Sequence, residues 1–134
     1  SLYGYGQSSD KLIQSFINIA TSGGQIEITG STNKINFIHA SDVAWAALQA
    51  YNTQSWNVFN ISSKENNSIL EVAENAVSIS RSGSITILND YNKDRGFTRF
   101  DLDSNLANES FCFEPKVSLK EGMKLMMKKT LIPC

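Results

Sequence analysis

The stretch Ile35-Asn36-Phe37-Ile38-His39-Ala40-Ser41-Asp42-Val43-Ala44 changes within a few residues from an extended pattern to a helical one. A polar turn over 30–34 leads into a short extended piece over 35–39. Either Ser41 or Asp42 can cap the helix that follows. Helical spacing then predicts one shared apolar face, made of Val43, Ala44, Ala47, Leu48 and Tyr51.

The alternation of strand and helix continues on both sides of this stretch. Apolar residues at three- and four-residue steps predict a helix over 10–21, which the glycines at 23 and 24 end. Short alternating runs over 26–28, 57–61 and 84–88 are typical of strands. The sequence therefore predicts a mixed α/β fold.

Two capping boxes mark the starts of further helices, one at Ser68–Glu71 and one at Ser118–Glu121. The segment 89–100 is rich in polar residues and is predicted to be an exposed loop. Eight side chains are expected to face inward from the two helices: Ile69, Val72, Ala73, Ala76, Leu119, Met123, Met126 and Met127.

Length and composition limit the possible functions. The 134 residues fit one domain, 1–134, and the net charge of -1 lacks the basic excess of a general nucleic-acid binder. No apolar run has the roughly 20 residues that cross a bilayer. We therefore expect no membrane partner. The two cysteines, Cys112 and Cys134, lie far apart, which argues against a disulfide framework and against a metal site. We expect a reduced, cytoplasmic setting.

The residues that carry common chemistries are incomplete. His39 is the only histidine, and no serine stands in a G-x-S-x-G elbow. The run Tyr3-Gly4-Tyr5-Gly6 lacks the third glycine of a dinucleotide-binding turn. We therefore expect no catalytic residue in this chain, and His39 is expected to be a packed or backbone-bonded side chain.

Four strings, in order and spread over the chain, resemble one family. The residues 3–7 (YGYGQ) resemble its Y-G-P-G-Q segment, and 36–44 (NFIHASDVA) resemble R-D-F-I-H-V-x-D-V-A. The residues 58–63 (VFNISS) are similar to V-Y-N-I-G-S, and 115–122 (PKVSLKEG) to P-x-V-S-L-E-E-G. The chain thus resembles the C-terminal half of the NAD-dependent epimerase/dehydratase family, the extended short-chain dehydrogenases/reductases that act on nucleotide sugars.

This resemblance implies a division of labour. In the family, an N-terminal Rossmann domain holds NAD or NADP and the catalytic Tyr-x-x-x-Lys, while the C-terminal half binds the nucleotide sugar. We therefore expect this chain to be a substrate-binding portion whose Rossmann domain lies upstream. The implied reaction is transient oxidation or reduction of a hexose, and the portion by itself is expected to be inactive and to bind no cofactor.

The resemblance also implies roles for particular residues. Arg95, with Arg99 second, is the candidate for bidentate hydrogen bonds to the diphosphate. Ile35 stands where the family commonly has an arginine, and Asn36 where it has an aspartate. The candidate substrate-binding residues are Arg95, Arg99, Ile28, Thr29, Asn36 and Phe37, and the candidate cofactor-binding residue is Tyr3.

A second interpretation stays open at this point. The chain can be a non-catalytic α/β module that binds an anionic ligand or a protein partner. Such a module would close its own core, whereas a severed half should expose an apolar patch on the order of several hundred Å². That patch would also favour a homodimer.

Overall fold

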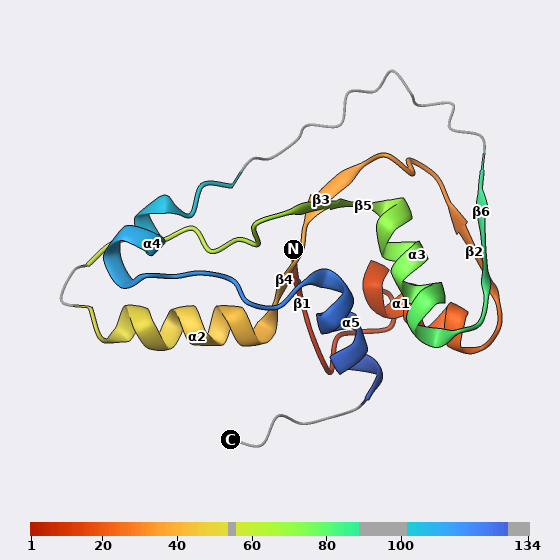
Figure 1. Ribbon diagram of the computed structural model, residues 1–134, viewed down its shortest axis with the longest axis horizontal. Coiled ribbons are helices and arrows are strands. Elements are labelled where there is room, and N and C mark those ends of the chain that lie inside the picture. Colours follow the sequence, from red (N-terminus) through yellow and green to blue (C-terminus); the bar gives the residue numbers. More distant parts are fainter. Residues whose placement is uncertain (54–55, 89–101, 129–134) are drawn as a thin grey trace.

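The computed structural model describes residues 1–53, 56–88 and 102–128. Within these ranges the chain forms short strands and five helices in a mixed α/β arrangement, as the sequence predicts (Figure 1). In chain order the elements are β1 (Leu2–Tyr3), α1 (Leu12–Thr21), β2 (Gln25–Ile28), β3 (Lys34–Asn36), β4 (Ile38–His39), α2 (Ala40–Tyr51), β5 (Asn66–Ser68), α3 (Ile69–Ser80), β6 (Ser84–Ile87), α4 (Asn105–Phe111) and α5 (Leu119–Met127).

The described strands form three pairs. β1 runs parallel to β4, with Tyr3 opposite His39, and β2 runs parallel to β6, with Ile26 opposite Ile85. β3 and β5 are antiparallel. The extended piece predicted over 35–39 is therefore divided at Phe37 into two strands that pair with different partners.

The larger core lies between α1, α3, α5 and the β2–β6 pair. Its fully buried members include Ile13, Ile26, Val72 and Met123. The predicted start of α3 is confirmed, because the Ser68 hydroxyl accepts a hydrogen bond from the Glu71 N–H and the Glu71 carboxylate accepts one from the Ser68 N–H. The inward faces predicted for α3 and α5 are confirmed as well.

The strand predicted over 57–61 is wrong. These residues form no strand, and the Val58 side chain is 87% exposed. The partner of β3 is instead the polar run 66–68. Alternation predicts which side chains would share one face of a strand, but it does not show whether a neighbouring strand is there to pair with. The prediction at 57–61 failed for this reason.

The predicted cap of α2 is also wrong. The N-cap is His39, whose Nδ1 accepts a hydrogen bond from the Ser41 N–H at 3.2 Å. Asp42 is buried and accepts from the N–H of Val117, 75 positions away, at 3.0 Å. The carboxylate of Asp42 therefore makes a tertiary contact with Val117, and the imidazole of His39 caps the helix.

The predicted inward face of α2 is mostly exposed. The fully buried residues of the helix are Asp42 and Ala46, and Ala46 packs with Ile38, Ala107 and Phe113 in a second, smaller core. Of the five residues predicted to face inward, only Val43 packs against this core, while the other four are exposed. The smaller core depends on α4, a helix that the sequence analysis did not predict.

Candidate functional site

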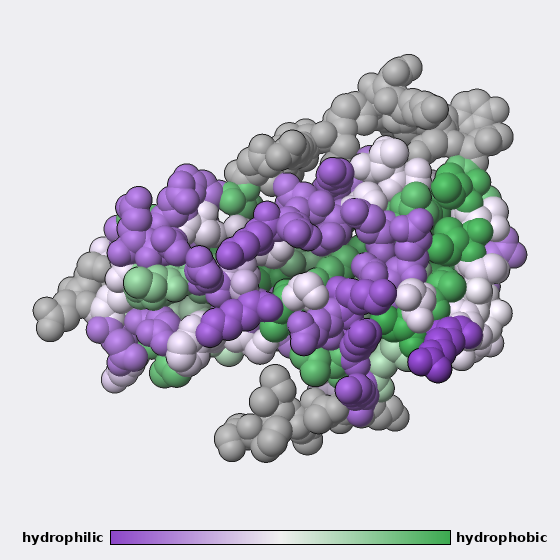
Figure 2. All heavy atoms as spheres, viewed as in Figure 1, coloured by the Kyte–Doolittle hydropathy of each residue, from purple (hydrophilic) through white to green (hydrophobic). Residues whose placement is uncertain are grey.

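The predicted substrate-binding residues 28 and 29 lie where β2 ends. Because β2 and β6 are parallel, their carboxyl ends share one edge, and the Leu88 N–H donates to the Ile28 carbonyl at 2.9 Å. Ile28 is buried in the core, whereas Thr29 is exposed. Figure 2 shows apolar surface near the β6 end of the molecule, where Ile87 and Leu88 are partly exposed. Ligands of open α/β sheets bind at such carboxyl edges.

The turn beyond Thr29 is held against α3. Gly30 has a φ of +65°, which lets the chain reverse directly after the strand. The carbonyls of Ser31 and Asn33 then accept hydrogen bonds from the Leu70 and Ile69 N–H groups at 3.1 and 3.0 Å. The first turn of α3 therefore fixes the turn that borders this edge.

The candidate arginines, Arg95 and Arg99, lie outside the described residues, as does the whole of the predicted loop over 89–100. The described residues that flank this segment in the sequence are Leu88 and Leu102. Leu88 lies beside Ile28, and the Leu102 carbonyl accepts a hydrogen bond from the Ser62 hydroxyl at 3.3 Å. The roles of Arg95 and Arg99 stay predictions.

Asn36 links β3 to the segment that precedes β5. Its Nδ2 donates to the Ser63 and Glu65 carbonyls at 3.0 and 3.3 Å and to Oδ1 of Asn66 at 3.1 Å. Its Oδ1 accepts from the Ser63 N–H at 2.9 Å. An aspartate has no N–H to donate to these carbonyls, so an asparagine suits this position. The amide already has protein partners on both its nitrogen and its oxygen.

Tyr3 and Phe37 are packed within the protein. The Tyr3 ring meets the rings of Phe37 and His39 edge to face, with centroids 6.3 and 5.2 Å apart. Its hydroxyl lies 3.4 Å from the Ser118 carbonyl. Burial, with a smaller contribution from nearby carboxylates, raises the pKa of Tyr3 well above its usual range, so the phenol stays neutral.

His39 is a buried side chain bonded to the backbone N–H of Ser41, as the sequence analysis expects, and this bond caps α2. Burial lowers its pKa, and the carboxylate of Asp42 offsets only part of this effect. Nδ1 faces both the N–H and the hydroxyl of Ser41, the latter at 2.7 Å. The neutral ring therefore carries its proton on Nε2, an assignment that follows from the hydrogen bonds.

Two cavities that sequence reasoning missed lie between 62–67 and 102–119. Their volumes are about 270 and 180 Å³, and both are lined by Ser63, Lys64 and Pro115. Lys64 also pairs with Glu114 at 3.6 Å, but both side chains are largely exposed. The lysine and the proline are 51 positions apart and only the fold brings them together.

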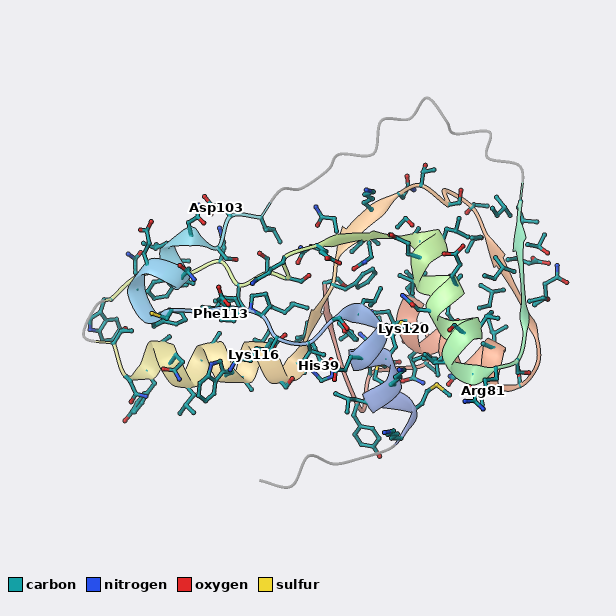
Figure 3. All side chains as sticks on the ribbon, viewed as in Figure 1. His39, Arg81, Asp103, Phe113, Lys116 and Lys120 are labelled. Carbon is teal, nitrogen blue, oxygen red and sulfur yellow. The ribbon has the colours of Figure 1, made fainter. Side chains whose placement is uncertain are left out.

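A third cavity, of about 440 Å³, lies against α2. It is lined by Trp45, Gln49, Phe111, Cys112, Glu114 and Lys116. The Lys116 ammonium sits 5.5 Å from the centre of the Trp45 ring, a cation–π distance. Figure 3 shows Lys116 on the stretch between α4 and α5 that runs alongside α2.

Residues 1–53, 56–88 and 102–128 contain no group of three or more His, Cys, Asp or Glu side chains that could hold a metal ion. In the same ranges, every helix is too short or too polar to span a bilayer.

The fold matches part of several solved enzymes. RMD from Pseudomonas aeruginosa, solved with NADPH, is 18% identical with a TM-score of 0.80, and the match covers 96% of this chain and 45% of that one. UDP-glucose 4-epimerase from Thermotoga maritima, solved with UDP-glucose, is 23% identical with a TM-score of 0.76, covering 96% and 43%. dTDP-glucose 4,6-dehydratase from Bacillus anthracis, solved with NAD, is 19% identical with a TM-score of 0.78, covering 96% and 41%.

The chain has the fold of part of these enzymes. It spans less than half the length of each of the three. No family model matches the sequence, and no curated protein matches it. At these identities the likeness concerns the fold, and the fold agrees with the family that the four sequence strings resemble.

Proposed function

We propose that this chain is the C-terminal, nucleotide-sugar-binding portion of an NAD(P)-dependent sugar-nucleotide epimerase or dehydratase. The observation that carries the proposal is a structural match that covers 96% of this chain. It covers less than half of the length of each of three enzymes, which were solved with NADPH, UDP-glucose or NAD. The four family-like strings point the same way from the sequence alone.

The edge shared by β2 and β6 is the proposed binding site. Thr29 is exposed there, and Ile28 and Phe37 belong to the core behind it. Arg95 and Arg99 belong to the segment that starts next to this edge, after Leu88. A guanidinium gives two parallel, charge-assisted hydrogen bonds to phosphate oxygens, so these arginines are the proposed diphosphate ligands.

The remaining chemistry is assigned to the rest of the enzyme. A nicotinamide cofactor supplies and removes hydride when bound, and the upstream Rossmann portion is proposed to hold it together with the catalytic tyrosine. The contribution of this chain is to bind and orient the nucleotide sugar. By itself it is proposed to be inactive and to bind no cofactor.

The test uses the polypeptide encoded by the whole reading frame that contains this chain. Binding of UDP-glucose and dTDP-glucose is measured by isothermal titration calorimetry for the parent and for Arg95→Ala. Losing a hydrogen bond to a charged group costs about 1.5–3 kcal/mol, so Kd should rise about 10- to 150-fold.

Arg81→Asn is the matched control. It removes the same charge, and asparagine tolerates the left-handed conformation at this C-cap, where φ is +53°. Arg81 precedes β6, whose first residue pairs with Gln25, so it lies toward the opposite end of the strands from Thr29. An equal effect of both substitutions would remove Arg95 from the site. If the parent bound neither UDP-glucose nor dTDP-glucose, the result would favour the second interpretation, a non-catalytic module.

A further inference from the structure

The cavity between α2 and the chain that runs from α4 to α5 has no role in the proposed function. We call it the α2–α4 cavity. Its volume is about 440 Å³, which is within the range of small-molecule sites in proteins. In Figure 1, α2 and α4 lie at one end of the molecule, whereas β2 and β6, which form the proposed nucleotide-sugar edge, lie at the other end.

The chain segment opposite α2 is held in place at both of its ends. At the first end, Cys112 follows α4 in the left-handed conformation, with a φ of +54°, and its N–H donates to the Asn108 carbonyl at 2.7 Å. At the second end, the Val117 N–H donates to the buried carboxylate of Asp42 at 3.0 Å. The wall of the cavity that faces α2 is therefore set by the fold.

Two aromatic rings line the α2–α4 cavity. Trp45 on α2 is 44% exposed, so part of its indole is free to contact a ligand. The Phe111 ring is half-buried and meets the Phe59 ring edge to face, with centroids 5.1 Å apart, which limits its orientation. Aromatic rings pack favourably against other planar rings in offset-stacked or edge-to-face geometry. The two rings therefore suit a flat aromatic ligand.

The charges around the cavity leave one cation without a counter-ion. The carboxylate of Glu114 already pairs with Lys64 at 3.6 Å. The ammonium of Lys116 lies 5.5 Å from the centre of the Trp45 ring, and it makes no ion pair with any residue that the structure describes. An anionic group at this ammonium would form a charge-assisted hydrogen bond beside the indole. The amide of Gln49, which also lines the cavity, offers a further donor.

We propose that the α2–α4 cavity binds a planar aromatic carboxylate, whose ring packs against Trp45 and Phe111 and whose carboxylate bonds to the ammonium of Lys116. A neutral aromatic ligand would leave Lys116 without a counter-ion. An aliphatic anion would leave the two rings without a planar partner. The proposal does not depend on the proposed function, because it uses none of the residues assigned to nucleotide-sugar binding.

The experiment measures binding of 2-naphthoate to the polypeptide of the whole reading frame by isothermal titration calorimetry. The neutral analogue 2-naphthalenemethanol keeps the ring but lacks the charge. It should bind about fivefold more weakly, which is the upper value for an exposed ion pair. Acetate keeps the charge but lacks the ring, and it should show no measurable binding. Added UDP-glucose should not change the Kd of 2-naphthoate.

Variants assign the binding to the cavity. Lys116→Gln should weaken 2-naphthoate binding about fivefold and leave 2-naphthalenemethanol binding unchanged. Trp45→Leu should weaken the binding of both compounds about 2- to 12-fold, as expected for the loss of an aromatic pair. The matched controls are Lys120→Gln and Trp56→Leu. Both side chains are exposed and neither lines the cavity, so neither substitution should change either Kd.

Cys112 can locate the ligand without any substitution. It is exposed, and it lines the α2–α4 cavity. At a 2-naphthoate concentration ten times its Kd, about a tenth of the sites are free. Labelling of Cys112 by N-ethylmaleimide, followed by mass spectrometry, should therefore slow about tenfold.

Each of four results would overturn the proposal. The first is an absence of 2-naphthoate binding. The second is an equal Kd for 2-naphthoate in the parent and in Lys116→Gln. The third is an unchanged labelling rate of Cys112 at the saturating concentration. The fourth is displacement of 2-naphthoate by UDP-glucose, which would place the compound in the nucleotide-sugar site.

Discussion

The buried contact between Asp42 and Val117 is expected to be a main support of the fold. It joins the first turn of α2 to the residue before the N-cap of α5, across 75 positions of sequence. Asp42→Ala removes a hydrogen bond to a charged group, worth about 1.5–3 kcal/mol. It also removes a carboxylate near a helix N-terminus, worth about 0.3–1 kcal/mol. The free energy of unfolding should fall by about 2–4 kcal/mol.

The assay is urea and thermal unfolding at neutral pH, followed by circular dichroism. At about 4 °C per kcal/mol for a domain of this size, Tm should fall by about 8–16 °C. Asp42→Asn keeps an acceptor for the Val117 N–H and should lose less. Glu74→Ala removes an exposed carboxylate on α3 and should change stability by less than about 0.5 kcal/mol. If Asp42→Ala behaved like Glu74→Ala, the assigned contact would be wrong.

Three further outcomes are expected. In Gly122→Ala the added methyl group would come 2.7 Å from Cζ of the buried Tyr3. Overpacking outweighs the gain in helix propensity, so the free energy of unfolding measured in urea should fall by about 1–2 kcal/mol. A more stable variant would show that the Tyr3 ring has room for the methyl group. The contribution of His39 to stability should decrease as the pH drops below about 6.5, because burial lowers the pKa of His39 in the folded protein and the unfolded chain then binds more protons. This part of the slope should be absent in His39→Asn, and an unchanged slope there would assign it to other groups. Ser68→Ala should lower the free energy of unfolding, measured by thermal unfolding, by about 1 kcal/mol. Ser118→Ala should lower it less, because the cap bond that it removes is longer, 3.3 Å against 3.1 Å. The reverse order of the two variants would contradict the cap geometry.

Local patterns predicted the parts of the fold that depend on neighbours in sequence. The helices α1, α3 and α5 were found from apolar spacing together with a glycine stop or a capping serine. The strand at 84–87 was found from its alternation. The same kind of signal failed at 57–61, where alternation has no neighbouring strand to pair with, and it gave no indication of α4 or β5.

The candidate site was only partly accessible from the sequence. The family resemblance led to Ile28, Thr29, Asn36 and Phe37, but only the fold shows that Thr29 is exposed while Ile28 and Phe37 are buried. The partners of Asn36 are Ser63, Glu65 and Asn66, about 30 positions away. No spacing rule connects such distant residues, because the contact depends on which strands pair.

By itself the sequence determined the α/β class, the starts of α3 and α5 and the family resemblance, since each depends on residues within a few positions or on short strings. The tertiary structure decided what those residues contact. His39 caps α2 in place of either predicted residue, Ser41 or Asp42, the Asp42 carboxylate bonds to Val117, and the apolar side of α2 stays exposed. The physical reason is that periodicity defines which side chains share a face, whereas burial of that face depends on what the rest of the chain brings against it.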